Sequence, residues 1–184
     1  MAKFTQIQTD IRADFETFEI DLLMDLRDGI REALEHPNMA DPAIQRLFPP
    51  AITDDDVEDA AVRLQFHDSL LESRLLGLDA LADILARAEP RRGGKHRVVL
   101  VQDEAPLFLG VINDLRLALA ARIGTDHVKR RDLDDDDPRA GGIVVLDHLA
   151  WLQEQLVRLL DPAASAHQDD PGFIARVESM DSDD

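Results

Sequence analysis

The stretch DEAPLFLGVINDLRLALAARIG, residues 103–124, decides the fold of this chain. Apolar residues occur on every side of the helix that it predicts, and such helices are usually buried in the interior of a protein. A charge inside such a helix must be paired or must reach an edge. The sequence therefore predicts a central helix with a built-in polar cluster, made of Asn113, Asp114, Arg116 and Arg122.

Capping and turn-forming residues bound this central helix. We expect Asp103 to cap its start and Pro106 to be tolerated in its first turn. Gly124 is expected to end the helix, because glycine readily adopts the left-handed conformation of a C-terminal cap.

The two arginines of the central helix are expected to be buried, because the helix is too apolar to be exposed. Arg116 and Arg122 should then each be held by a carboxylate or by several backbone carbonyls. Breaking a deeply buried pair costs about 3 to 5 kcal/mol, so the sequence predicts that Arg116→Met destabilises the protein strongly. The candidate partners are Asp114, Asp147, Glu154 and acidic residues of the first two helices.

Helical periodicity recurs on both sides of this stretch, with apolar residues three and four positions apart. Thr53 is expected to cap the longest of these segments. More than thirty residues is long for one globular helix, so we expect a break near Ser73 or Gly77. The periodicity predicts four helical segments besides the central one: residues 14–36, a short turn at 42–48, residues 53–88 and residues 143–160.

The β-structure predicted from the sequence is small. Residues 98–101 form a β-branched and aliphatic run that is typical of a strand, and residues 89–97 before it form a turn-rich loop. A lone strand is not stable, so its natural partner is the N-terminal segment, residues 4–13. That segment fits either two short strands joined near Thr9 or a frayed start to the first helix. The fold class is therefore mainly α: four or five helices bundled around the central helix, with at most a small two- or three-stranded sheet.

The length of 184 residues favours one domain. We expect residues 1–162 to form this single helical domain and residues 163–184, which are acidic and rich in small residues, to be a disordered tail. No apolar run reaches the length of a membrane span, and the N-terminus lacks the apolar core of a signal peptide. The sequence therefore predicts a cytoplasmic protein without a membrane partner.

The formal net charge of −18 argues against nucleic acid as a partner, because an acidic surface repels phosphate backbones. Lys129 to Arg131 are cancelled by five acidic residues within 132–137. The remaining basic candidates read as a solvated loop: Arg91, Arg92, Lys95 and Arg97.

The sequence offers little that is typical of an enzyme. Absence of cysteine excludes disulfides, thiol catalysis and Cys-ligated zinc. The Glu-x-x-His pairs of di-iron bundles are missing, and residues 132–137 lack the alternation of a calcium loop. His67 and His148 are interpreted as partly buried helix residues rather than catalytic bases. We therefore predict no catalytic residue, no metal and no cofactor.

The candidate binding residues lie on the central and last helices. Asn113 and Arg116 share a helix face, while Glu154 and Arg158 are four apart and able to pair. Trp151 projects from a mixed face of the last helix, which often marks an interface. These polar groups either pair between packed helices and fix their register, or line a pocket or partner-binding groove. The full candidate set is Asn113, Asp114, Arg116, Arg122, Trp151, Gln153, Glu154 and Arg158.

Two of these segments, INDLRLALAARIG and LDHLAWLQEQLVRLL, carry a family resemblance. The chain resembles the actinobacterial domain-of-unknown-function family two-thousand-and-seventeen, most specifically over residues 98–160. The pattern consists of Asn-Asp-Leu-Arg-Leu, a second arginine six residues on, and an aromatic helix with Leu-Gln-Glu-x-Leu-Val-Arg. The chain departs from the family pattern at Ala120-Ala121, where a glycine is frequent in the family. It also departs in its long acidic loop, residues 125–142.

The resemblance implies no established activity. It implies a link to protein degradation, because family genes often lie near the gene of the protease adaptor that reads protein N-termini. Some members carry a transcriptional-regulator label, against which the acidic charge argues.

Two functions follow from the sequence. The first is a non-enzymatic interaction or regulatory protein, with a protein partner or self-association through the last helix. The alternative is a small-molecule-binding protein or enzyme that uses Asn113, Arg116 and Glu154 in a polar helix-lined pocket.

Overall fold

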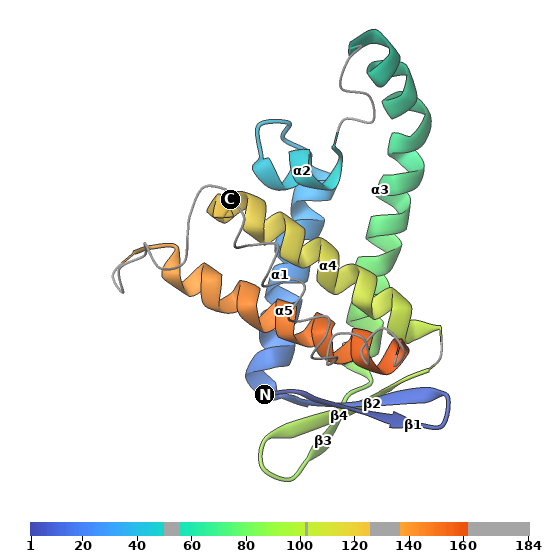
Figure 1. The fold of residues 1–184 in the computed structure, drawn as a ribbon, viewed down its shortest axis with the longest axis vertical. Helices are drawn as coiled ribbons and strands as arrows, with labels where there is room; N and C mark the ends of the chain where they lie inside the picture. Colours follow the sequence, from blue (N-terminus) through green and yellow to red (C-terminus); the bar gives the residue numbers. More distant parts are fainter. Residues whose placement is uncertain (50–55, 102, 126–136, 162–184) are drawn as a thin grey trace, which may run out of the picture.

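The fold, seen in a computed structural model, is mainly helical with a small antiparallel sheet (Figure 1). The structure describes residues 1–49, 56–101, 103–125 and 137–161, of which 56–67 are described by their backbone alone. Thr53 and the predicted tail lie outside these residues. The strands in the described part are β1 (Lys3–Ile7), β2 (Asp10–Glu16), β3 (Glu89–Arg91) and β4 (Lys95–Leu100). The helices there are α1 (Thr17–Glu35), α2 (Pro42–Leu47), α3 (Asp56–Ala86), α4 (Glu104–Ile123) and α5 (Ala140–Leu160).

The sheet has four strands in the order β1-β2-β4-β3, with every neighbouring pair antiparallel. The predicted pairing of the 98–101 run with the N-terminal segment is confirmed, with Leu100 opposite Ile11. The prediction of at most two or three strands was wrong, because residues 89–97 belong to a hairpin of β3 and β4 rather than to a loop. Gly93 and Gly94 have φ of 77° and 71°, a left-handed conformation that lets the chain reverse between β3 and β4.

The N-terminal segment forms two strands, the first of the two alternatives that the sequence left open. Ile11, Ala13 and Phe15 are buried on alternate positions of β2, so they face the helices on one side of the sheet. The helical spacing predicted that the first helix begins near residue 14, but it begins at Thr17. Phe15 fits both periodicities, and pairing with β4 decides in favour of the strand.

The long third helix is unbroken, contrary to the predicted break near Ser73 or Gly77. Gly77 is buried where α3 meets α4, and a Cβ atom built there would lie 3.0 Å from Val111 Cγ2. The glycine therefore allows a close approach between two helices instead of interrupting one. Gly142 is likewise inside a helix, since α5 begins at Ala140, three residues before the start that the sequence predicted.

Helix α4 packs against α1, α2, α3 and α5, and its Phe108, Ile112 and Leu115 are fully buried. A bundle arranged around α4 stays a prediction. Gly124 ends the helix in the left-handed conformation, as predicted. Asp103 occupies the N-cap position but makes no capping hydrogen bond; Glu104 instead accepts one from the Val101 amide.

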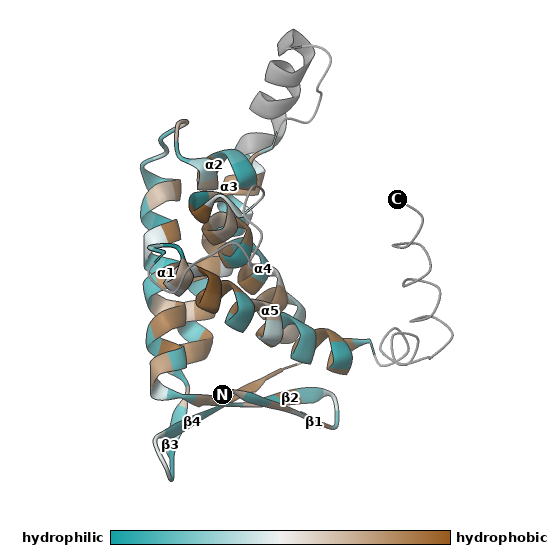
Figure 2. Ribbon diagram, turned by 60° about the vertical axis from the view of Figure 1, so that its left-hand side comes forward, coloured by the Kyte–Doolittle hydropathy of each residue, from teal (hydrophilic) through white to brown (hydrophobic). Residues whose placement is uncertain are grey.

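The helices lie on one side of the sheet, and Figures 1 and 2 both show the sheet at one end of the molecule. Contacts between β2 and α1, β4 and α3, and β1 and α5 join the two layers. The other face of the sheet carries polar residues, among them Asp14, whose carboxylate accepts a 2.6 Å hydrogen bond from Arg97. No helix in the described part of the chain is long and apolar enough to cross a membrane.

Candidate binding surface between the first and last helices

The start of α1 is organised around Glu19, a charged side chain that is fully buried. Its Oε1 accepts a 2.8 Å hydrogen bond from the Ala2 amide, and its Oε2 accepts one of 2.9 Å from the Glu16 amide. The second bond belongs to a capping box, in which residues at the N-cap and N3 positions satisfy each other's backbone groups. Glu19 therefore fixes the start of β1 against the start of α1.

His148 on α5 lies directly against this carboxylate. Its Nε2 is 3.2 Å from Glu19 Oε1, although the pair lacks hydrogen-bond geometry. Burial lowers the pKa of His148 below its ordinary value, and the negative charge of Glu19 only partly opposes this effect. The His148 ring stacks on Trp151, with ring centroids 6.1 Å apart, and is 6.4 Å from the Phe18 ring.

An apolar groove lies between α1 and α5, and His148 is part of its lining. Its volume is about 530 Å³, within the range of binding clefts. Phe18 and Val144 border it and remain 54% and 64% exposed, so large apolar surface faces solvent here. We call this surface the α1–α5 groove; its lining is Met1, Phe18, Leu22, Val144, Val145, Asp147, His148 and Trp151.

Helix α1 sorts its charges to two sides. Arg27 and Arg31 are four residues apart and turn toward α3, where Arg27 donates a 2.9 Å hydrogen bond to Asp79. Asp21 and Asp25 lie three and seven residues after Phe18, so they continue the groove side of the helix, where both are exposed. The apolar groove therefore borders an acidic stripe on α1, formed by Asp21, Asp25 and Glu32.

Three of the predicted site residues form a hydrogen-bonded chain at the α4–α5 contact. Arg116 Nη1 donates a 2.9 Å hydrogen bond to Gln153 Oε1, and Gln153 Nε2 donates one of 3.2 Å to Asn113 Oδ1. These bonds connect α4 with α5 and match the interpretation that polar groups fix helix register. Trp151, two residues before Gln153, lies instead in the α1–α5 groove.

The other predicted residues are dispersed. Asp114 forms an ion pair with Arg74 of α3, while Arg122 donates a 2.7 Å hydrogen bond to Asp41, which begins α2. That bond lowers the pKa of the Asp41 carboxyl. Glu154 and Arg158 pair on the exposed side of α5 at 2.6 Å, as their spacing predicted. The structure does not gather the eight residues into one site.

The predicted burial of the two arginines was wrong. Arg116 is exposed, and it contacts the amide of Gln153 rather than a carboxylate. Arg122 is also exposed at the end of α4, and its partner Asp41 belongs to the connector before α2, outside the candidate partners. Long arginine side chains cover apolar helix surface with their stems while the charged ends reach water, so an apolar helix does not force their burial.

A second cavity, of about 360 Å³, lies between α3 and α4. Asn113 and Asp114 line it together with Arg74, Ser73 and two glycines, Gly77 and Gly110. Arg116 borders a different, smaller cavity between α4 and α5. Neither of these two cavities is lined by Asn113, Arg116 and Glu154 together.

Sequence reasoning missed the two residues that organise the α1–α5 groove. Glu19 follows Glu16 by three positions, which is the spacing of a capping box, but Glu16 is not the Ser, Thr, Asp or Asn that marks such a box in a sequence. Phe18 continues the apolar spacing of α1, although it is exposed. His148 is partly buried on its helix, as expected. Among the described residues, no group of three or more acidic or histidine side chains is arranged to hold a metal ion.

These features define a mainly helical protein with a small sheet and an apolar groove at its surface. The family model described as Domain of unknown function (DUF2017) matches residues 1–160, and the chain belongs to this family. The resemblance carried by residues 98–160 is thereby confirmed.

The chain is also similar to the oxidative stress regulator AosR of Mycobacterium tuberculosis and of Mycobacterium bovis, at 28% identity over 133 residues in both cases. The similarity covers 65% of this chain and 58% of the length of these relatives. No solved structure matches the chain.

Proposed function

We propose that this protein is a non-enzymatic interaction or regulatory protein that binds a protein partner through the α1–α5 groove. The observation that carries the proposal is the exposure of Phe18 and Val144 beside the groove. Contiguous exposed apolar surface marks interaction sites on soluble proteins. Trp151, which lines the same groove, belongs to a residue type that often dominates binding energy.

The similarity to an oxidative stress regulator supports a regulatory role. The chain contains no cysteine, so a response to oxidants within these residues would not use a thiol. The family resemblance implies a link to protein degradation. We therefore propose that the partner belongs to a proteolytic system.

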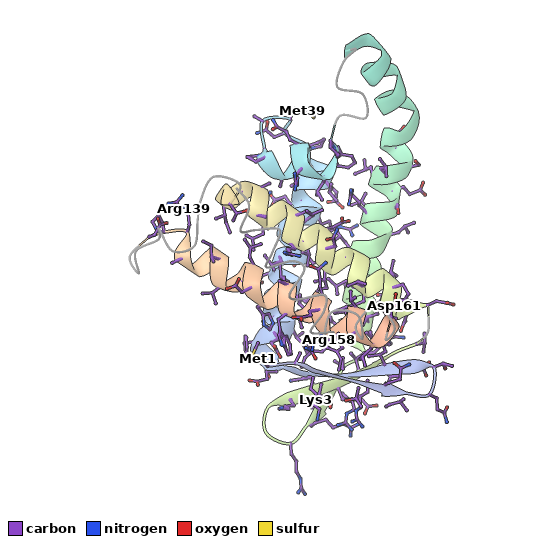
Figure 3. All side chains as sticks on the ribbon, viewed as in Figure 1. Met1, Lys3, Met39, Arg139, Arg158 and Asp161 are labelled. Carbon is purple, nitrogen blue, oxygen red and sulfur yellow. The ribbon has the colours of Figure 1, made fainter. Side chains whose placement is uncertain are left out.

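Capture from extract of the native cells tests this function. The tagged full chain is compared with Phe18→Ser and Val144→Ser, which remove exposed apolar side chains and therefore leave the core intact. Met39→Ser is the matched control: Met39 is 59% exposed and lies in the connector between α1 and α2, far from Met1, as Figure 3 shows. We expect a stoichiometric partner with wild type and control, and its loss with both groove variants. Recovery of no stoichiometric partner, at low salt and at high, would contradict the proposal.

A second candidate function is small-molecule binding in the cavity between α3 and α4. The observation that favours it is the convergence of Ser73, Arg74, Asn113 and Asp114 on one cavity. Thermal-shift screening with polar metabolites tests it. A ligand that raises the melting temperature of wild type but not of Asn113→Leu would support this candidate, and the absence of any such ligand would remove it.

A further inference from the structure

We infer that the occupant of the α1–α5 groove is a cationic amphipathic helix of a partner protein. This inference rests on the proposed function and names the chemistry of the partner. The groove supplies apolar contacts, so the partner must present apolar side chains toward it. The acidic stripe of Asp21, Asp25 and Glu32 continues from the groove along α1, so basic side chains beside the apolar ones would find complementary charge.

Charge also argues against the two other occupants that this chain itself could supply. Residues 163–184 contain six acidic residues against the single basic residue Arg176, so the acidic stripe would repel that segment. A second copy carries the same formal net charge of −18 and would bring two acidic stripes together in a symmetric pairing. A basic partner avoids both costs.

The sorting of charges on α1 makes this stripe a local feature rather than a share of the overall acidity. The basic residues Arg27 and Arg31 lie on the opposite side of α1, where both form ion pairs with Asp79 of α3. They therefore do not neutralise Asp21 and Asp25 on the groove side. On this side of α1 the carboxylates of Asp21 and Asp25 follow Phe18 at helical spacing. The lysines and arginines of a partner would contact these carboxylates while its apolar side chains contact the groove.

Fluorescence titration of Trp151 tests the inference, because it is the single tryptophan of the chain and lines the groove. The probes are three tryptophan-free peptides of equal length: an amphipathic Leu/Lys helix, the same helix with Glu in place of Lys, and a scrambled Leu/Lys sequence. We expect the first to change the emission, with an affinity that falls as salt is added, and the other two to bind weakly or not at all.

Variants of the full chain locate the binding charge. Asp21→Asn with Asp25→Asn should lower the affinity for the cationic helix about three- to tenfold, since each exposed ion pair contributes a few tenths to one kcal/mol. Asp83→Asn with Asp103→Asn is the matched control, because it removes the same charge at exposed positions on α3 and before α4. Equal losses in both double variants would show general attraction to an acidic protein and would overturn the inference.

The remaining outcomes separate this inference from the proposed function. If the native partner depends on Phe18 and Val144 but no cationic helix binds, the function stands and the basic occupant is wrong. Dimers of the full chain that dissociate on Phe18→Ser would identify a second copy as the occupant. A chain ending at residue 161 that binds the peptide more than tenfold tighter than the full chain would identify the C-terminal segment as the occupant. Both results would overturn the inference.

Discussion

At the scale of single residues, burial rather than charge decides which polar side chain the fold depends on. Glu19 is fully buried and accepts hydrogen bonds from two backbone amides. Arg116 is exposed and donates a hydrogen bond to one side-chain amide. Arg116→Met should therefore lower the free energy of unfolding by about 1 kcal/mol or less, the contribution of one ordinary hydrogen bond. This replaces the loss of about 3 to 5 kcal/mol that the sequence alone predicted on the premise of burial.

Glu19→Gln is expected to cost more than Arg116→Met. The glutamine amide offers one acceptor oxygen where the carboxylate offers two, so one of the amides of Ala2 and Glu16 loses its partner. A buried donor left without a partner costs about 1–3 kcal/mol. Urea unfolding of both variants beside wild type measures the two losses. A larger loss for Arg116→Met would show that the arginine, and not the carboxylate, organises the fold.

His148 gives stability a dependence on pH with a definite sign. Burial lowers its pKa in the folded protein, so the unfolded chain binds a proton first as pH falls below the ordinary value of 6.5. Stability from the neutral ring is complete above that value and is lost as pH falls toward the lowered folded-state pKa, by at most about 1.4 kcal/mol per pH unit. Unfolding free energies at pH 7.5 and 5.5 should differ more for wild type than for His148→Gln. An equal difference would remove His148 as the cause.

At the scale of elements, two glycines inside helices should respond in opposite directions to alanine. At Gly29 in α1 a Cβ would meet nothing within 4 Å, whereas at Gly77 it would meet Val111 Cγ2 at 3.0 Å. Gly29→Ala should therefore stabilise the protein by about 0.5–1 kcal/mol through helix propensity. In Gly77→Ala the same gain is opposed by contact with a valine whose χ1 angle is stiff in a helix, so α3 and α4 must separate slightly. Melting temperatures of the two variants decide the matter: a rise for both would mean that α3 and α4 have room to spare.

Elements were predictable where one periodicity acts alone. The spacing of apolar residues located α1, α4 and α5, and Pro42 marked the first residue of α2. Boundaries failed where two patterns overlap, as at Phe15, which continues both the alternation of β2 and the helical stripe of α1. The β3–β4 hairpin was missed because Glu89–Arg91 is exposed along its whole length and shows no apolar alternation. The α1–α5 groove joins Phe18 to Val144, and periodicity within a helix gives no information about such distant pairs.

At the scale of the whole molecule, the charge is unevenly distributed. The outer face of the sheet alternates signs along one row, where Lys3 lies opposite Asp14, Asp14 opposite Arg97, and Arg97 opposite Glu89. Opposite charges in such cross-strand positions attract, so this face does not add to the excess negative charge. The excess lies elsewhere, and the groove side of α1 is one place where the structure shows it.

A net charge of −18 should make stability depend on salt, because like charges repel one another in the compact state. Adding sodium chloride from about 0.01 to 0.15 M shortens the screening length from about 30 to 8 Å, so the melting temperature should rise. A chain ending at residue 161 lacks six acidic residues and Arg176 and has a formal charge of −13, apart from the change in the free C-terminus. If residues 163–184 form a tail outside the domain, as their composition predicts, this shorter chain should keep a cooperative transition and show a smaller rise with salt. A large loss of melting temperature on truncation would instead place part of that segment in the folded domain.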